Sequence, residues 1–191
     1  MESNAIQPIL LIVPGMGNSG PEHWQTHLQQ VFTGARRVEL EDWYDFDCDT
    51  WVLALDAAIR AIDGPVILAG HSAGVIAIVQ WAQRHYIPKK IQGALLVAPA
   101  DFEMEREDSA PLEYVTAAGW IPIPREPLPF RSILVASDDD PYTGIKRSAL
   151  FAQEWGSQFI NLGAQGHINV ASGYGHWPLG EELINDLLKP I

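Results

Sequence analysis

The sequence predicts an α/β fold, a three-layer sandwich in which helices cover both faces of a mostly parallel β-sheet. Continuous apolar runs recur along the chain and have the length and composition of strands buried on both faces. The segments between these runs repeat apolar residues at helical spacing. Regular alternation of strand and helix favours right-handed crossovers and a doubly wound sheet, in which ligands gather outside the carboxyl ends of the strands.

The expected strands follow from the positions of the apolar runs. The first run ends at a Pro-Gly-Met-Gly turn, and the second ends at Gly70. Two weaker runs add to four strong ones, so a sheet of roughly six strands is expected. In chain order the expected strands are 9–13, 37–41, 65–69, 93–97, 132–136 and 158–162, of which 37–41 and 158–162 are the weaker ones.

Helices are expected in the segments between and after these strands. In one of them, Trp51, Leu55 and Ile59 recur at the spacing of one helix face. In chain order the expected helices are 22–32, 50–62, 73–85, 145–155 and 179–188.

The length and composition predict one domain that spans residues 1–191. A chain of 191 residues can bury a sizeable core, and no Ser/Gly-rich or charged linker divides it. Hydrophobic residues make up 47% of the chain and charged residues 19%, which is typical of a globular protein.

The longest interruption of the strand–helix pattern is the segment 99–130. A loop of this length inside a compact domain is usually functional, so a small cap over a site is one interpretation. The other is a surface excursion with a helical turn at 112–118, and the sequence leaves both open. The segment opens with an acidic patch, which consists of Asp101, Glu103, Glu105, Glu107 and Asp108.

Charge and cysteine content restrict the partners and the compartment. The formal net charge of −12 repels a nucleic-acid backbone and an anionic membrane surface, so neither partner is expected. Cys48 is the single cysteine and cannot close an intramolecular disulfide, so a packing role is expected. The apolar run 9–13 is too short for a signal peptide or a membrane span. We therefore expect a cytoplasmic protein. The sequence gives no indication of an oligomeric partner.

The residues 70–74, Gly-His-Ser-Ala-Gly, form a Gly-x-Ser-x-Gly motif between an expected strand and an expected helix. A nucleophile elbow requires this strand-turn-helix setting, which makes Ser72 the candidate nucleophile. Gly70 and Gly74 lack the β-carbons that would collide with the neighbouring strand and helix. His71 is the neighbour of Ser72 on a tight turn and should point away from it, so we expect it to be a buried, hydrogen-bonded histidine.

Two backbone amides are candidates for stabilising an oxyanion beside Ser72. The Ala73 N–H lies at the start of the expected helix, where amides point outward without intrahelical partners. The Met16 N–H lies in the glycine-rich loop after the first strand. The alternative interpretation of that loop is a glycine-rich turn that leads into a helix. A phosphate-binding loop is disfavoured because no lysine follows the glycines.

The general base and its acid are expected after Ser72, because α/β-hydrolases carry these residues in the order serine, acid, histidine. His167 and His176 lie far enough along the chain, and His167 is preferred because it falls in the loop after the last strand. The acid is expected after the strand 132–136, where three aspartates lie together. We select Asp140, which precedes a rigid proline, and Asp139 is the alternative.

Several motifs together resemble one known group of proteins. They are Pro-Gly-Met-Gly at 14–17, His-Trp at 23–24, the 70–74 turn, Asp-Asp-Pro at 139–141, Gly-His-Ile-Asn at 166–169 and Ser-Gly-Tyr-Gly-His-Trp-Pro at 172–178. This combination spans nearly the whole chain and resembles the small serine hydrolases of the α/β-hydrolase superfamily typified by retinoblastoma-binding protein 9.

The resemblance implies a six-stranded parallel core, a triad of Ser72, Asp140 and His167, and no cofactor. It also supports Asp140 over Asp139 as the acid. Trp24 and Trp177 look like family positions near the rim of the active site, although packing of loops against the body explains them equally well.

The expected function is a serine hydrolase that cleaves a small ester, thioester or amide through an acyl-enzyme on Ser72, with no metal and no cofactor. With little chain left for a lid, an open site is expected. The alternative is a non-catalytic protein-binding module on a hydrolase scaffold, since a fold alone does not establish function. A flavodoxin-like domain is disfavoured because no phosphate or flavin loop is found.

Overall fold

Six strands form one parallel sheet in the order β2-β1-β3-β4-β5-β6. The computed structural model describes residues 7–107 and 109–189. The chain first steps from β1 outward to β2 and then continues on the other side of β1, so the path reverses direction between β1 and β3. Ligand sites of doubly wound sheets lie at such a switch point. The strands are β1 (Ile9–Val13), β2 (Arg36–Arg37), β3 (Val66–His71), β4 (Ile91–Val97), β5 (Arg131–Ala136) and β6 (Gln158–Asn161).

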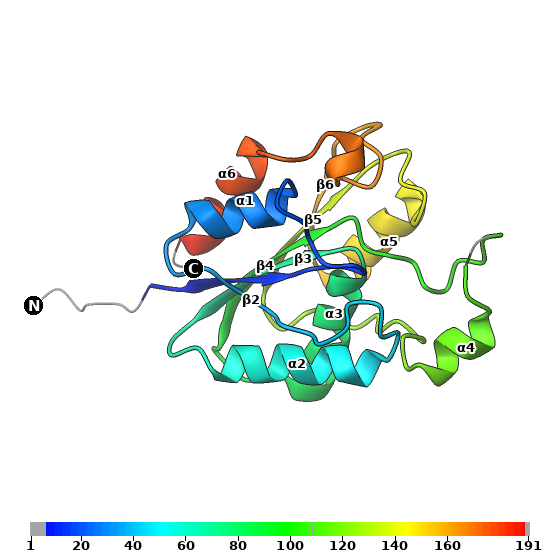
Figure 1. Cartoon of the computed structure of the whole chain (residues 1–191), viewed down its shortest axis with the longest axis horizontal. Coiled ribbons are helices and arrows are strands. Elements are labelled where there is room, and N and C mark those ends of the chain that lie inside the picture. Colours follow the sequence, from blue (N-terminus) through cyan, green and yellow to red (C-terminus); the bar gives the residue numbers. More distant parts are fainter. Residues whose placement is uncertain (1–6, 108, 190–191) are drawn as a thin grey trace, which may run out of the picture.

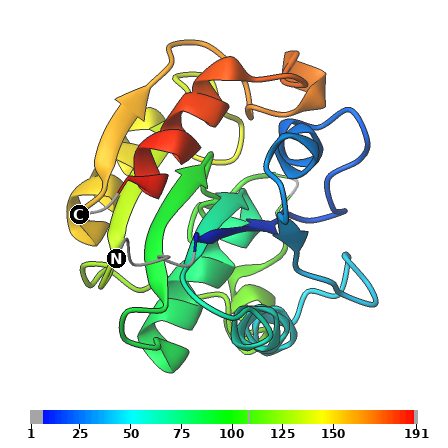
Figure 2. The same cartoon turned by 90° about the vertical axis from the view of Figure 1, so that its left-hand side faces the viewer.

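Helices cover both faces of this sheet, as Figures 1 and 2 show. Alternate side chains of β1 point to opposite faces, so Leu10 and Ile12 join one core while Leu11 and Val13 join the other. The first core is closed by α1 (Trp24–Val31) and α6 (Pro178–Leu188). The second core is closed by α2 (Cys48–Arg60), α3 (Ala73–His85) and α5 (Ile145–Trp155).

The structure confirms the six-stranded parallel sheet and the helices expected from the sequence, with small shifts at their ends. The strand expected at 37–41 is wrong in extent, because β2 comprises only Arg36 and Arg37. The Val38 N–H still donates to the Ile12 carbonyl over 3.0 Å. Since β1 ends at Val13, the chain beyond Val38 has no strand left to pair with.

The segment 99–130 contains the short helix α4 (Leu112–Ala117), which lies beyond the carboxyl ends of the strands (Figure 1). Trp120 anchors it: this side chain is fully buried, and its indole N–H donates to the Phe46 carbonyl over 3.2 Å. The helical turn expected at 112–118 is confirmed.

Part of the acidic patch is paired rather than solvated. Asp101 accepts a hydrogen bond from Arg147 Nε over 3.0 Å, and its own side chain is 7% exposed. The Glu103 carboxylate pairs with Arg125 and Arg147 and accepts the Ile123 N–H over 2.8 Å. These bonds fasten the segment 99–130 to α5. Over the described part of the chain, no helix has the length and apolar character that a bilayer crossing demands.

Candidate active site

Ser72 lies on the sharp turn between β3 and α3, at the switch point of the sheet. Its backbone angles are φ 55° and ψ −122°, an uncommon conformation for a residue with a β-carbon. Glycine is required at position 74, where a Cβ would lie 2.3 Å from the Val13 carbonyl oxygen. A Cβ at Gly70 would lie 2.7 Å from Ile78 Cδ1. The two glycines therefore let the turn pack against β1 and α3.

Ser72, His167 and Asp140 form a continuous hydrogen-bonded chain. Ser72 Oγ lies 2.9 Å from His167 Nε2, and His167 Nδ1 lies 2.9 Å and 3.0 Å from the two Asp140 carboxylate oxygens. The side chains of His167 and Asp140 are 8% and 3% exposed. Because the carboxylate can only accept, Nδ1 carries the proton and Nε2 is free to accept from the serine.

Asp139, the alternative acid, does not contact His167 but holds the loop that carries it. Asp139 Oδ1 accepts the Ser137 hydroxyl and the Gly166 N–H, each over 2.7 Å. The Ser137 hydroxyl, followed by the Gly166 amide, lowers the pKa of Asp139 below its usual value. The other candidate base, His176, is exposed and pairs with Glu181 over 3.0 Å. The structure therefore brings together Ser72, His167 and Asp140 and leaves the two alternatives outside.

Two side chains hold successive carbonyls of the histidine loop. His71 Nε2 donates to the His167 carbonyl, and Trp24 Nε1 donates to the Ile168 carbonyl, both over 2.9 Å. Ile168 is fully buried with φ 48°, a strained conformation for a β-branched residue. Burial, the main cause, lowers the pKa of His71 well below its usual value, and the neighbouring His167 and His23 add to this effect. His71 is therefore the buried, hydrogen-bonded histidine that we expected, and its ring is neutral.

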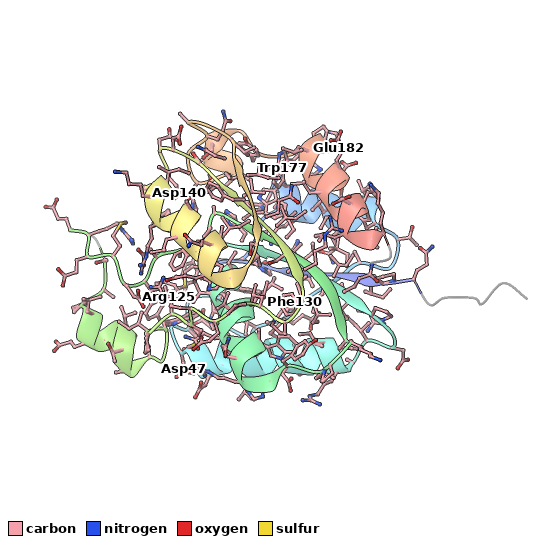
Figure 3. All side chains as sticks on the ribbon, turned by 180° about the vertical axis from the view of Figure 1, so that it is seen from behind. Asp47, Arg125, Phe130, Asp140, Trp177 and Glu182 are labelled. Carbon is pink, nitrogen blue, oxygen red and sulfur yellow. The ribbon has the colours of Figure 1, made fainter. Side chains whose placement is uncertain are left out.

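Trp24 and Trp177 do not lie on the rim where the resemblance put them. Trp24 is fully buried and Trp177 is 7% exposed, and their rings meet edge to face at 5.2 Å in the core under α1 and α6. Figure 3 shows Trp177 beside the start of α6, whereas Asp140 lies toward the end of the molecule that carries α4. Trp24 is therefore a support for the histidine loop. Loop packing, the other interpretation of these residues, agrees with this placement.

The amides of Met16 and Ala73 lie beside Ser72, on the wall of the same cavity. Within residues 7–107 and 109–189, neither amide donates to a protein acceptor. The backbone at Gly15 approaches the turn so closely that a Cβ there would lie 2.9 Å from Ser72 Cβ. The loop that carries Met16 therefore packs directly against the turn that carries Ser72 and Ala73.

Gln25 is a site residue that the sequence analysis missed. It is fully buried, and its amide nitrogen donates to the Val13 carbonyl over 3.1 Å and to the Ala69 carbonyl over 2.9 Å. Its oxygen accepts the Ser19 hydroxyl. Gln25 thus ties the ends of β1 and β3 to the Met16 loop. Its only signal in the sequence is a polar residue on the buried face of an amphipathic helix.

His23 is a second missed residue, and it lines the cavity. Its Nδ1 accepts the Gln25 N–H over 3.2 Å at the start of α1, so the proton of the neutral ring is on Nε2. Burial lowers the pKa of His23 to about 4, and electrostatic interactions with Arg37 and His167 add to this effect. The ring is therefore uncharged at neutral pH and presents a donor to the site.

The cavity in front of Ser72 has a volume of about 480 Å³. Its polar side carries His167, His23 and Tyr142, whose ring meets the His167 ring at 4.5 Å. Its apolar side carries Phe46 and residues of the segment 99–130, including Phe102, Met104 and Val115. The segment therefore forms a wall of the cavity. Among the described side chains no group of three metal-ligating residues converges.

A serine on the turn after the third strand, a histidine–aspartate pair beside it and a parallel sheet in this strand order define the fold class of α/β-hydrolases. The family model described as serine hydrolase matches residues 10–186, and the chain therefore belongs to the serine hydrolase family. This confirms the family expected from the motifs.

Solved structures agree with this assignment. A protein of Pectobacterium atrosepticum described as a YdeN-like hydrolase is 33% identical over 96% of this chain and 94% of its own, with a TM-score of 0.81. The ydeN gene product of Bacillus subtilis is 15% identical over 95% of this chain and 98% of its own, with a TM-score of 0.76. Mouse alpha/beta hydrolase domain-containing protein 10 is 16% identical over 97% of this chain and 91% of its own, with a TM-score of 0.69. No curated protein sequence matches the chain significantly.

Proposed function

We propose that the protein hydrolyses a carboxylic ester, thioester or amide through an acyl-enzyme on Ser72. The observation that carries this proposal is the chain of hydrogen bonds from Ser72 Oγ through His167 to Asp140, with 2.9 Å between the serine oxygen and the imidazole nitrogen. Membership of the serine hydrolase family supports the same activity.

The first half of the reaction forms the acyl-enzyme. His167 Nε2 accepts the Ser72 proton while Oγ attacks the carbonyl carbon, and the carbonyl oxygen takes the negative charge. The Met16 and Ala73 amides donate to this oxyanion, and one such donor is typically worth about 3 kcal/mol in the transition state. When the tetrahedral intermediate collapses, the bond to the leaving group breaks and His167 returns the proton to it.

The second half releases the acyl group. Water occupies the place of the leaving group and gives a proton to His167 Nε2 as its oxygen attacks the acyl carbon. Collapse then breaks the bond to Ser72 Oγ, which recovers the proton from His167, and a carboxylic acid leaves. Asp140 holds the imidazole in the required tautomer and stabilises the imidazolium that forms in each half.

A fluorophosphonate probe tests the proposal, because it phosphonylates only an activated serine. We expect labelling of the wild type and none of Ser72→Ala, with a fall in p-nitrophenyl ester hydrolysis of at least about 1000-fold for the variant. Ser109 lines the same cavity, so Ser109→Ala is the matched control and should label normally. Equal labelling of Ser72→Ala, or no labelling of the wild type, would exclude the mechanism and favour the non-catalytic binding module.

A further inference from the structure

In the proposed function, each substituent of the reacting carbonyl carbon must face a particular group of the site. The location of the acyl group therefore follows from the proposed function and rests on it. The oxyanion must face the Met16 and Ala73 amides. The leaving group must face His167 Nε2, because that nitrogen protonates it. The acyl group therefore occupies the part of the cavity that remains, away from His167.

The side of the cavity nearest His167 is polar. His71 and Tyr142 pack against the His167 ring with ring centres 4.7 Å and 4.5 Å away, and His23 packs against His71 at 4.9 Å. Tyr142 carries a hydroxyl and His23 carries an N–H on Nε2, and both groups suit a polar leaving group or an attacking water. The leaving-group side therefore offers little apolar surface.

The cavity also has an apolar wall, which we define as Phe46, Phe102, Met104, Ala110 and Val115, all lining the cavity that contains Ser72. The loop before α2, which carries Phe46, runs beside the Met16 loop, where the Gly17 N–H donates to the Trp43 carbonyl over 3.1 Å. Phe46 therefore lies on the side of the cavity that the Met16 loop forms.

The wall is held rigidly by an aromatic cluster behind it. Phe102 packs against Phe46 at 5.5 Å and against Trp120 at 4.9 Å between ring centres. The Tyr114 ring of α4 stacks on Phe46 at 5.7 Å. The buried Trp120 also donates to the Phe46 carbonyl, which fixes the backbone of that loop. A preformed apolar surface of this kind gains binding energy from an apolar group without first having to be ordered.

We propose that the apolar wall binds the acyl group, so that the preferred substrates carry a medium-sized apolar acyl chain, such as hexanoyl, rather than acetyl. The polar head of the leaving group then faces His167 and Tyr142. A cavity of about 480 Å³ suits such a chain but not a long fatty acyl group.

A series of p-nitrophenyl esters tests the proposal, because only the acyl chain changes. Burial of one methylene is worth up to about fourfold in binding. We therefore expect kcat/KM for the hexanoate to exceed that for the acetate by at least roughly tenfold, and kcat/KM for the dodecanoate to fall again. An acetate that is as good a substrate as the hexanoate would overturn the inference.

Variants of the wall locate the effect. Ala110→Trp fills the apolar side, and Phe102→Ala removes part of it, so each should reduce the hexanoate-to-acetate ratio of kcat/KM by at least about fivefold, with acetate hydrolysis changed less. Leu53→Ala removes an apolar side chain from the exposed face of α2, outside the cavity, and should leave the ratio unchanged. Unchanged ratios in both wall variants would contradict the proposal.

Two further measurements separate the possible failures. Fluorophosphonate labelling of Ser72 reports the nucleophile without an acyl chain, so loss of labelling would refute the proposed function itself. Normal labelling without a chain-length preference would refute only the acyl assignment. Hexyl acetate places the six-carbon chain on the alcohol side of the ester. If kcat/KM rises more from ethyl acetate to hexyl acetate than from p-nitrophenyl acetate to the hexanoate, the wall binds the leaving group.

Discussion

At the scale of single residues, the three neighbouring aspartates after β5 have three separate roles. Asp138 Oδ1 accepts from Asn161 over 2.8 Å, and Asp139 accepts from Ser137 and Gly166. Asp140 alone reaches His167. Three like charges so close together need separate partners, and each aspartate finds its own donors. The segment therefore positions both Asp140 and the loop that carries His167.

We expect the variants Asp140→Asn and Asp139→Asn to differ sharply. An amide at 140 no longer stabilises the imidazolium and disfavours the required tautomer of His167, so kcat should fall by about 1000-fold or more. At 139 the amide oxygen can still accept the Gly166 N–H, so kcat should fall by less than about tenfold. Steady-state ester hydrolysis gives kcat for the two variants. A larger fall in kcat for Asp139→Asn than for Asp140→Asn would assign the acid to Asp139.

At the scale of secondary structure, the first turn of α1 organises the site. Three consecutive positions are used: His23 reaches the cavity, Trp24 holds the Ile168 carbonyl, and Gln25 ties the ends of β1 and β3. A helix can do this because successive side chains leave it in different directions. The α1 helix therefore couples the Met16 loop, the strand ends and the histidine loop.

We expect Trp24→Phe to weaken both folding and catalysis. The buried Ile168 carbonyl loses its indole donor, so the free energy of unfolding should fall by about 1–3 kcal/mol. Because the His167 loop is then held less firmly, kcat should fall while KM changes little. Trp177→Phe is the matched control, since within the described residues the Trp177 indole N–H makes no hydrogen bond. Equal kcat losses in the two variants would refute the positioning role.

At the scale of the whole molecule, the fold buries neutral imidazoles in an acidic protein. His71 and His23 are 6% exposed, and burial lowers the pKa of each. The net charge of −12 favours protonated histidines in general, but it does not reverse the lowered pKa values of these two rings. Desolvation disfavours the charged form of a buried ring even when distant charges are negative. The two rings therefore resist protonation in the neighbourhood of His167.

The buried His23 makes stability depend on pH. The pKa of His23 is about 4 in the folded state and 6.5 in the unfolded state, so the unfolded chain binds more protons between these values. The free energy of unfolding should therefore fall as the pH is lowered from 6.5 to 4, by up to about 3 kcal/mol from this residue. His23→Asn keeps a helix-capping acceptor and removes the titration.

Urea denaturation across this pH range measures the effect. The wild type should lose more stability than His23→Asn as the pH falls, and the difference between the two proteins cancels contributions from the many carboxylates. Parallel stability curves for the two proteins would show that His23 is protonated equally easily in both states.

Much of the fold and part of the site could be predicted from the sequence. The buried strands and amphipathic helices depend on apolar spacing along a few residues, which the sequence displays directly. The β2 strand was misjudged in extent because its length depends on where its partner β1 ends. Ser72 could be placed because its motif lies between a strand and a helix. Gln25 and His23 could not, since their partners lie on other segments.

The sequence by itself determined the order and type of the elements, the turn that exposes Ser72 and the short lists from which the acid and the base would come. These features depend on local spacing and on chain order. Only the tertiary structure decided that Asp140 rather than Asp139 reaches His167, that Trp24 lies inside the core, and that the segment 99–130 forms a wall of the cavity. These features depend on distances and burial between segments far apart in the chain, which packing sets and local patterns do not record.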